Sequence, residues 1–288
     1  MSIVVTGATG HLGRLIVEAL LRDGTNPAHI VAAGRAVEKL DDLAAKGVRV
    51  ARIDYTDPAS LAAAFEGAST LMLVSGSEVG QRFAQHSAAI DAAKAAGISR
   101  IVYTSAPAAT TSALILAPEH KATEEYLEAS GVPFTILRNG WYTENYVQAA
   151  QQGAATGVIA ASVGEGTVSS ASRADYADAA AAVLVSDGHD GAVYELSGDT
   201  AWGFAELAAT VAELAGKEVT YSALTPEQHA ETLTGFGLDE GTVGFVVALD
   251  GNIRDGLLGH TPGDLSRLIG RPTTPLKTTL AEALDAGV

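Results

Sequence analysis

Short hydrophobic runs alternate with longer amphipathic segments along roughly the first 140 residues of the chain. A short apolar run rich in Val and Ile is typical of a buried strand, and a longer amphipathic segment is typical of a helix. The pattern predicts strands at Ile3–Thr6, Ile30–Ala33, Val48–Ile53, Thr70–Val74, Ile101–Thr104 and Phe134–Arg138. Because parallel strands are joined by helical crossovers, the alternation predicts an α/β fold with a doubly wound parallel sheet of Rossmann type.

Helices are predicted in the segments between these strands. They run to about Arg22, through AVEKLDDLAAKG to Gly47, from Asp57 and Pro58 through LAAAFEG, through QRFAQHSAAIDAAKAAG to Gly97, and from Pro118 to Ser130. The cap residues agree with these limits, since Asp followed by Pro favours a helix start and Gly favours a helix end.

The alternation loosens after Gly140. The pattern there predicts a helix near Glu144–Gln152, a strand near Val168, a helix over SRADYADAAAAVLVS, a strand in AVYELSG, a helix in AELAATVAELAG, a strand in VTYSA and several helices to the end. We expect a Rossmann domain over residues 1–150, to which part of 151–200 returns. A smaller α/β lobe over 200–288 is expected to cap the strand ends.

Composition narrows the classes of function. The 288 residues are 47% hydrophobic, contain no Cys and carry a formal net charge of −16 at pH 7. A chain without Cys has no disulfide, no thiolate nucleophile and no Cys-ligated metal. Such a negative surface repels phosphate backbones and anionic lipids, which argues against nucleic-acid and membrane partners. With neither a signal peptide nor a membrane-length apolar run in the sequence, we expect a cytoplasmic protein.

The segment IVVTGATGHLG, residues 3–13, is the strongest local signal in the chain. A strand that ends in glycines and turns directly into a helix holds a phosphate against backbone N–H groups and the positive end of the helix dipole. The alternative is a glycine-rich turn that binds nothing. The residues of this segment predicted to contact a dinucleotide cofactor are Gly7, Ala8, Thr9, Gly10, His11, Leu12 and Gly13.

The end of the second predicted strand indicates which dinucleotide binds. A protein that selects NAD places Asp or Glu there, whereas this chain has Gly34-Arg35, with Lys39 one helical turn further on. Arg can form a forked hydrogen bond with a 2′-phosphate that a carboxylate would repel. We therefore predict NADPH over NADH, the alternative being a solvated surface arginine.

The remaining strand ends supply further candidate cofactor contacts, because ligands of parallel sheets bind at the carboxyl ends of the strands. Asp54, followed by Tyr55, is expected either to accept a hydrogen bond from the adenine amino group or only to cap its own turn. The small residues after the fourth strand suit the cofactor ribose, and the hydroxyls after the fifth suit the nicotinamide. In full, these candidates are Asp54, Tyr55, Ser75, Gly76, Ser77, Thr104, Ser105, Asn139, Gly140 and Trp141.

Several strings resemble the NmrA-like atypical short-chain dehydrogenases over nearly the whole chain. They are TGATGHLG, the GR after the second strand, DYTDPASLAAAFEG, VSGSEVGQR, AAKAAGISRIVYTS, EHKATEEYLEASGVPFTILRNGWYTENY and LSRLIGRPTTPLKTTL. Within that group, SEVGQR and LRNGWYTENY are most similar to the bacterial NAD(P)H-quinone oxidoreductases, and the triphenylmethane dye reductases are similar too. The resemblance implies an NADPH-binding Rossmann fold whose small C-terminal lobe closes a substrate cleft. The same group also contains NADP-sensing regulators that have no catalytic activity.

The residues used by ordinary short-chain dehydrogenases are missing. Those enzymes use Tyr and a Lys four residues later, where this chain has His120 and Glu124. Reversible alcohol–ketone chemistry is therefore unlikely, but a quinone or a cationic dye accepts hydride without that pair. We expect His120, with a pKa near neutrality, as a proton donor, and Tyr142 and Asn145 to orient the acceptor. His120 and Glu124 are also metal-ligand types on one helix face, but two ligands without a third predict no metal site.

Each of these site residues has a structural alternative. His120 is equally a polar residue at a helix start. Trp141 or Phe83 is expected to stack on an aromatic substrate, and Trp141 and Tyr142 serve equally as packing between lobes.

The sequence thus predicts an NADPH-dependent oxidoreductase that passes hydride to a quinone or a similar electron-poor acceptor. The alternatives are a non-catalytic NADP(H) sensor and a triphenylmethane dye-type reductase. The expected partners are a small aromatic or quinone molecule and, at most, a second copy of the chain.

Overall fold

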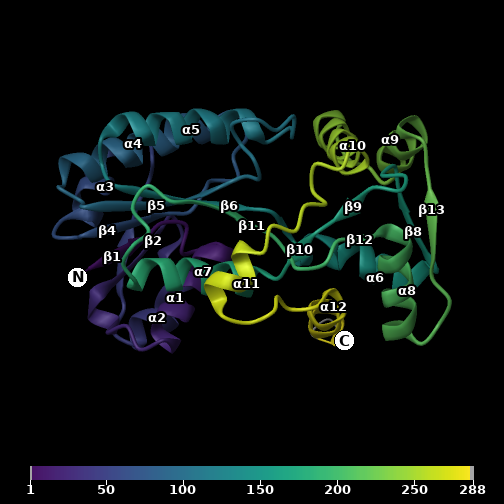
Figure 1. Ribbon diagram of the computed structural model, residues 1–288, viewed down its shortest axis with the longest axis horizontal. Helices are drawn as coiled ribbons and strands as arrows, with labels where there is room; N and C mark the ends of the chain where they lie inside the picture. The colour runs from purple at the N-terminus through teal and green to yellow at the C-terminus, as the bar shows by residue number, and fades with distance from the viewer. Residues whose placement is uncertain (1, 286–288) are drawn as a thin grey trace.

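The computed structural model describes residues 2–285. A seven-stranded parallel sheet forms the centre of the larger of its two parts (Figure 1). The strand order is β11-β6-β5-β4-β1-β2-β3, and every neighbouring pair is parallel. The strands are β1 (Ile3–Val5), β2 (Ile30–Gly34), β3 (Arg49–Arg52), β4 (Thr70–Leu73), β5 (Arg100–Ser105), β6 (Phe134–Asn139) and β11 (Val193–Leu196). The order reverses between β1 and β4, so the doubly wound Rossmann fold predicted from the sequence is confirmed.

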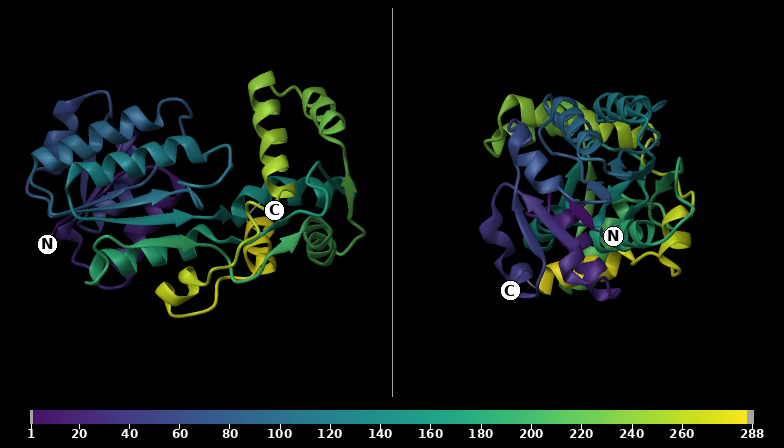
Figure 2. Two further views of the ribbon diagram at one scale, coloured as in Figure 1. Left: turned by 45° about the horizontal axis from the view of Figure 1, so that its top comes forward. Right: turned by 90° about the vertical axis from the view of Figure 1, so that its left-hand side faces the viewer.

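Helices cover both faces of this sheet (Figures 1 and 2). One layer holds α1 (His11–Arg22), α2 (Asp41–Ala45), α7 (Arg173–Val185) and α11 (Asp264–Ile269). The other layer holds α3 (Pro58–Phe65), α4 (Arg82–Ala95) and α5 (Ala117–Ser130). Side chains alternate across the strands: Val4 packs in the core under α3, α4 and α5, and its neighbours Ile3 and Val5 pack in the core against α1 and α7.

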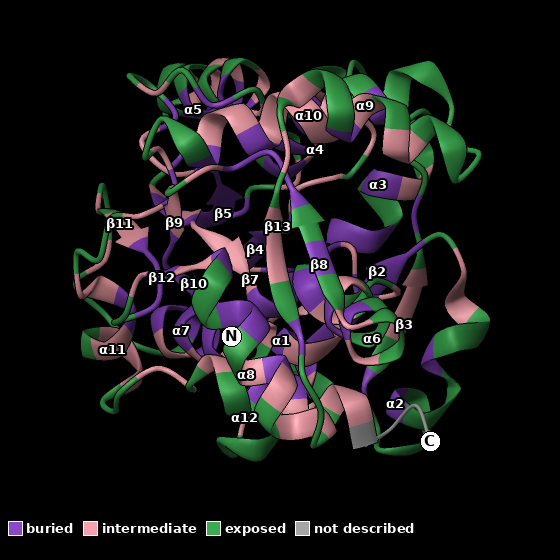
Figure 3. Cartoon of the chain, turned by 90° about the vertical axis from the view of Figure 1, so that its right-hand side faces the viewer, coloured by how far each residue is buried: buried purple, intermediate pink, exposed green. Residues whose placement is uncertain are grey.

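A smaller lobe lies beyond the carboxyl ends of the strands (Figure 1). Its strands are short and pair β7 (Trp141–Tyr142) with β10 (Ser170–Ala171), β9 (Thr167–Val168) with β12 (Trp202–Gly203), and β8 (Val158–Ala161) with β13 (Thr220–Ala223). Its helices are α6 (Val147–Thr156), α8 (Phe204–Ala215), α9 (Pro226–Gly235), α10 (Glu240–Arg254) and α12 (Leu276–Asp285). Figure 3 views this end, with β8 and β13 in front. The lobe has its own core, in which the Tyr146 and Trp202 rings meet edge to face at 4.8 Å.

The two parts are interleaved along the chain. After β6 the chain enters the smaller lobe through β7 to β9, returns to the sheet through α7 and β11, and then enters the lobe again at β12. The late helix α11 packs against α7 and β11, on the sheet side of the molecule. We therefore propose a Rossmann part that combines residues 2–140, 173–196 and 264–269, and the boundaries at 150 and 200 stay predictions.

Two predicted helices differ from the structure. The segment AVEKLDDLAAKG forms a 3-10 turn (Val37–Leu40) and the one-turn helix α2, because Leu40 and Leu43 alone are buried and anchor each piece to the sheet. The helix expected near Glu144–Gln152 begins with a 3-10 turn (Thr143–Tyr146) and continues as α6 to Thr156. A further 3-10 turn, Pro27–His29, precedes β2.

Candidate functional site

A cavity of about 500 Å³ lies at the carboxyl ends of the sheet strands, where the strand order reverses. Segments that follow β1 to β6 all reach it, and the smaller lobe closes it. Its lining includes most of the residues predicted as candidates: Gly7, Thr9, Gly10, His11, Leu12, Gly13, Arg35, Tyr55, Ser75, Gly76, Ser77, Ser105, His120, Asn139, Gly140, Trp141, Tyr142 and Asn145. Four predicted contacts do not line it: Ala8, Lys39, Asp54 and Thr104.

The glycine loop after β1 is shaped by close backbone contacts. Gly7 has φ of +63°, a left-handed conformation that favours glycine, and its carbonyl accepts a hydrogen bond from the Gly10 amide at 2.9 Å. A Cβ on Gly13 would lie 2.3 Å from the Gly7 carbonyl oxygen, so α1 approaches the strand only without a side chain there. A Cβ on Gly10 would meet no atom other than that oxygen within 4 Å, so the space beside Gly10 is open to a ligand, while its amide is bonded within the loop.

Ala8 is enclosed within the same loop. Its side chain is fully buried and its amide donates to the Ala33 carbonyl at the end of β2, at 3.0 Å. The Ala8 amide is therefore occupied by the fold, and Ala8 does not line the cavity, so its contact with a cofactor stays a prediction.

Arg35 already has an anionic partner. Its Nη1 lies 2.7 Å from Glu78 Oε1, and Gln85 donates to the other carboxylate oxygen of Glu78 at 2.7 Å. Hydrogen bonding to Gln85 and Arg35 holds the pKa of Glu78 below its usual range. This ion pair joins the end of β2 to the loop after β4, and both residues line the cavity.

Asp54 and Lys39, two further predicted cofactor contacts, do not line the cavity. The Asp54 carboxylate accepts hydrogen bonds from the Thr56 amide and hydroxyl at 2.8 and 2.7 Å, so it caps its own turn, as the structural alternative had it. Lys39 is exposed, and its carbonyl accepts a hydrogen bond from Arg14. Neither side chain lines the cavity.

The loop after β4, residues 75–81, is tied to α4 and α5 by polar contacts that sequence analysis missed. The Gly76 amide donates to His86 Nε2 at 3.1 Å, and its carbonyl accepts from Arg82 Nε at 2.8 Å. Arg82, which is 5% exposed, also pairs with Glu119 at 2.9 Å. Glu119 accepts from the Gly80 amide as well, so one buried arginine and one glutamate hold both halves of the loop.

The hydroxyls after β5 are partly used within the fold. Thr104 accepts a hydrogen bond from the Ser75 amide at 2.8 Å and does not reach the cavity, which corrects its predicted place at the nicotinamide. Ser105 donates to Glu124 at 2.5 Å and still lines the cavity, where its oxygen lone pair can accept. Glu124, at the position of the missing lysine, forms an ion pair with Arg138 at 2.6 Å. The charge of its carboxylate is therefore balanced by the Arg138 guanidinium.

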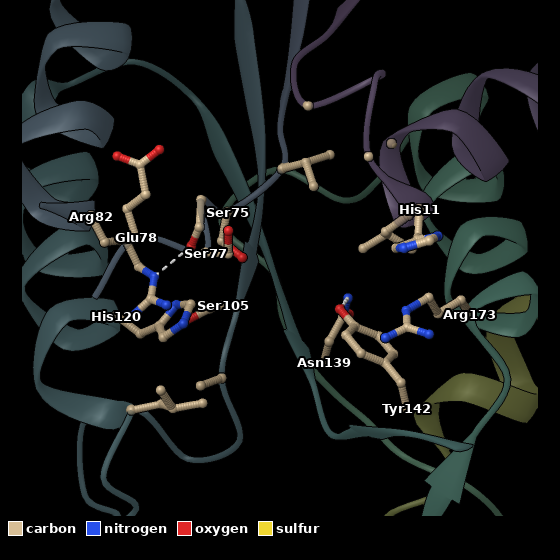
Figure 4. A pocket seen from close by; sticks show the side chains of 18 of the residues that line it. His11, Ser75, Ser77, Glu78, Arg82, Ser105, His120, Asn139, Tyr142 and Arg173 are labelled. Atoms are coloured by element: carbon tan, nitrogen blue, oxygen red, sulfur yellow. Dashed lines mark hydrogen bonds between the residues drawn. The ribbon is translucent and has the colours of Figure 1, made fainter. Parts of the chain in front are cut away.

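His120 lies in the wall of the cavity (Figure 4). Its Nδ1 is hydrogen-bonded to the Tyr103 hydroxyl at 2.7 Å. Burial, with the positive charge of Arg82 nearby, lowers the pKa of His120 to about 3. The expected pKa near neutrality is therefore wrong, because a buried imidazole avoids its charged form. At neutral pH His120 is a neutral hydrogen-bonding group.

The opposite wall carries a second polar group of residues (Figure 4). Asn139 Nδ2 donates to the Tyr142 hydroxyl at 3.2 Å, and Arg173 Nη2 donates to Asn145 Oδ1 at 2.9 Å. The Arg173 guanidinium lies over the Tyr142 ring, 4.8 Å from its centroid. Arg173, the first residue of α7, is not predicted from the sequence. No local pattern reveals it, because Arg173 meets β7 only in the folded chain.

The two aromatic candidates for stacking on a substrate, Trp141 and Phe83, lie in different places. Trp141 lines the cavity and also packs against the core of the smaller lobe, so it fits both the stacking and the packing interpretation. Phe83 is 39% exposed, stands edge to face with Tyr126 and does not line the cavity. Its expected stacking on a substrate is therefore corrected: Phe83 faces outward from α4.

The cavity fits a nicotinamide dinucleotide. Asn139 is 4% exposed, and its Oδ1 is buried with no partner among the described residues, so it is an acceptor available to a ligand N–H or O–H. The open space beside Gly10, the start of α1 and the Arg35 cation line the same cavity. Within residues 2–285, no group of three or more His, Asp or Glu side chains is placed so that it could hold a metal ion. In the same part of the chain, every helix is too short or too polar to cross a membrane.

Known proteins with the same features are similar along nearly the whole chain. The chain is 46% identical over 284 residues to quinone oxidoreductase 2 of Escherichia coli (strain K12), with 98% of this chain and 97% of that protein covered. The structure of an NADPH-dependent quinone oxidoreductase from E. coli complexed with NADPH matches with a TM-score of 0.94, at 44% identity over 98% and 99% of the two chains. Citrobacter sp. triphenylmethane reductase, complexed with NADP(H), matches with a TM-score of 0.93, at 37% identity over 98% and 100%.

These similarities confirm the resemblance carried by the sequence motifs. Residues 7–187, which include the glycine loop and most of the cavity wall, match the NAD(P)H-binding family. The chain belongs to that family of NAD(P)H-binding proteins.

Proposed function

We propose that this protein is an NADPH-dependent oxidoreductase that transfers hydride to a quinone or a similar electron-poor acceptor. One observation carries the proposal: a single cavity holds the glycine loop and Arg35 at one end and an apolar compartment at the other. Leu114, Leu116 and Trp141 line that compartment and suit a flat aromatic molecule. The similarity to a quinone oxidoreductase supports the same choice of acceptor.

The residues that would hold NADPH follow from the geometry. The amides of His11 and Leu12 at the start of α1 would meet the pyrophosphate, beside the open space at Gly10. Arg35 would meet the 2′-phosphate. Asn139 Oδ1 and the Ser105 hydroxyl oxygen would accept hydrogen bonds at the nicotinamide end. When bound, the cofactor supplies the hydride.

The chain's own contribution is binding, orientation and exclusion of water. Trp141 and the leucines hold the acceptor in a dry compartment, and the neutral His120 offers Nε2 as a hydrogen-bonding group to an acceptor oxygen. Among the described residues, His120 forms its side-chain hydrogen bond through Nδ1, which leaves Nε2 for the cavity. We infer that quinone reduction here needs no Tyr–Lys pair at positions 120 and 124.

Arg35 is the expected selector between cofactors. Arg35→Asp is expected to weaken NADPH binding about tenfold to a hundredfold, because a charge-assisted hydrogen bond is lost and a repulsion is gained. NADH binding is expected to change far less. Fluorescence titration with both cofactors measures this, with Arg49→Asp, an exposed arginine on β3, as the matched control. Equal loss for NADPH and NADH would remove Arg35 from the 2′-phosphate.

Two alternatives are separated by assays with different acceptors. Decolourisation of a cationic triphenylmethane dye with NADPH, without reduction of quinones, would favour a dye reductase. Tight NADPH binding without turnover of either acceptor would favour a sensor. The similarity to triphenylmethane reductase is the observation that keeps the dye in the comparison. A homodimer and a cytoplasmic location stay predictions, and light scattering tests the first.

A further inference from the structure

Tyr142 and Arg173 form a tyrosine–cation pair on the cavity wall opposite His120 (Figure 4). The guanidinium carbon lies 4.8 Å from the centroid of the Tyr142 ring. Arg173 is held in place by Asn145 Oδ1 at 2.9 Å and by the Glu144 carboxylate at 3.7 Å. Tyr176 packs edge to face on the other side of Tyr142, with ring centroids 5.2 Å apart. The ring and its cation are therefore fixed relative to the cavity.

The Tyr142 hydroxyl has its own proton to give. Its oxygen accepts from Asn139 Nδ2 at 3.2 Å, and among the described residues the hydroxyl has no acceptor. Because Asn139 occupies a lone pair, the O–H is free to donate to a molecule in the cavity. The hydroxyl therefore lies beside the unpartnered Asn139 Oδ1, at the end where the acceptor would sit.

The surrounding charges favour a protonated Tyr142 whose anion is still stabilised. Burial raises the pKa of Tyr142, whereas the Asn139 hydrogen bond and the Arg173 charge lower it and the Glu144 charge raises it. The phenol therefore holds its proton at neutral pH. Once the proton leaves, the Asn139 N–H already points at the phenolate oxygen and the Arg173 cation already lies over the ring.

We propose that Tyr142 is the catalytic proton donor to the reduced acceptor, and that Arg173 is the positioning cation that stabilises the phenolate left behind. The inference rests on the proposed quinone reduction. The pair would do the work of the Tyr–Lys pair that is missing at residues 120 and 124, with the tyrosine on β7 and the cation on α7.

A quinone that accepts a hydride gains two electrons and one proton, and becomes a hydroquinone monoanion. The Tyr142 O–H bond breaks and a new O–H bond forms on the anionic oxygen, which gives the neutral hydroquinone. The Tyr142 phenolate then takes a proton from water, so no further oxidant or reductant is needed. A cationic dye is neutralised by hydride alone and requires no such proton.

The test combines two variants with a titration that does not depend on turnover. The ultraviolet difference between wild type and Tyr142→Phe isolates the phenol of Tyr142 during an alkaline titration of the unliganded protein. Arg173→Gln is expected to raise that titration midpoint by about one pH unit, because the neighbouring cation is lost. Arg173→Lys is expected to restore most of the shift. Arg267→Gln is the matched control, since Arg267 lies over Tyr194 at 5.6 Å in the same manner and is remote from the cavity.

Turnover supplies the second measurement. With a quinone, Tyr142→Phe is expected to lower kcat about tenfold to a hundredfold, and the loss should exceed the loss with a cationic dye by about tenfold. The alkaline limb of the quinone kcat profile should move to higher pH in Arg173→Gln. NADPH affinity, measured by fluorescence, should stay within about twofold of wild type in both variants, because neither residue is assigned to the phosphates.

Two results would overturn the proposal: an unchanged Tyr142 titration in Arg173→Gln, and an unchanged quinone kcat in Tyr142→Phe. If the unchanged titration is accompanied by a loss of NADPH affinity, Arg173 is a cofactor ligand instead. A wild-type protein that binds NADPH and reduces no quinone contradicts the proposed function instead, and the titration still decides whether the pair exists.

Discussion

Single residues set the electrostatics of the cofactor cavity. Arg35 meets the Glu78 carboxylate at 2.7 Å, so a 2′-phosphate would compete with Glu78 for the same guanidinium. Glu78 is anionic at neutral pH, and the hydrogen bonds from Gln85 and Arg35 lower its pKa further. In a protein of net charge −16, this local competition limits how strongly one exposed arginine favours NADPH.

Neutralising Glu78 is expected to strengthen NADPH binding. Glu78→Gln keeps the shape of the side chain and removes its charge, so the dissociation constant for NADPH should fall about two- to fivefold, with little change for NADH. Fluorescence titration at low and high salt measures this, and the gain should shrink at high salt because exposed charges are screened. Glu66→Gln, an exposed glutamate after α3, is the matched control. An equal gain for both cofactors would separate Glu78 from the 2′-phosphate.

At the scale of elements, the loop after β4 depends on two helices. Arg82 on α4 and Glu119 on α5 bind the Gly76 carbonyl, the Gly80 amide and each other. The loop lines the cavity through Ser75, Ser77 and Glu78, so its rigidity affects the cofactor. Stability and binding are therefore linked through one ion pair.

Replacing Arg82 is expected to loosen this loop. Arg82→Met should lower the free energy of unfolding by about 1.5–3 kcal/mol, since hydrogen bonds from a buried charged group are lost. Amide exchange in residues 75–81 should speed up, and NADPH binding should weaken. Lys121→Met serves as control, because its pair with Glu125 is exposed, spans 3.9 Å and contributes little. Faster exchange spread evenly over the molecule, rather than in the loop, would contradict the role given to Arg82.

Much of the element pattern could be predicted from the sequence because it is local. Strand alternation, the helix start at Asp57, the helix end at Gly97 and the glycine turn all depend on neighbouring residues. The pairs Arg35–Glu78 and Tyr142–Arg173 could not be predicted, because they join segments that meet only after the sheet and the smaller lobe assemble. The expected pKa of His120 near neutrality is wrong for a related reason, since the burial of His120 depends on the packing of α5 against β5.

At the scale of the whole molecule, two buried histidines make the fold sensitive to acid. Burial, with the Arg82 charge nearby, lowers the pKa of both His86 and His120 from 6.5 to about 3. Below pH 6.5 the unfolded chain takes up protons that the folded chain does not. Stability is therefore complete above the unfolded pKa and falls as the pH drops towards the folded one.

The size of this effect can be measured by urea unfolding at pH 7 and at pH 5. Each histidine is expected to remove about 2 kcal/mol from the free energy of unfolding over that interval. The double variant His86→Gln/His120→Asn keeps an acceptor at each hydrogen bond and should lose less stability between the two pH values. His29→Gln, at an exposed position, should behave as wild type. An identical pH dependence in the double variant would show that other groups control acid stability.

On the proposed mechanism, this protein transfers two electrons from NADPH to a quinone in one step. A single-turnover stopped-flow reaction tests it most directly, with the NADPH-bound protein mixed anaerobically with 1,4-benzoquinone. We predict that nicotinamide absorbance disappears in the same exponential as hydroquinone appears, in equal amounts, and much faster than when NADH replaces NADPH. Bound NADPH that stays reduced in the presence of the quinone would contradict the claim.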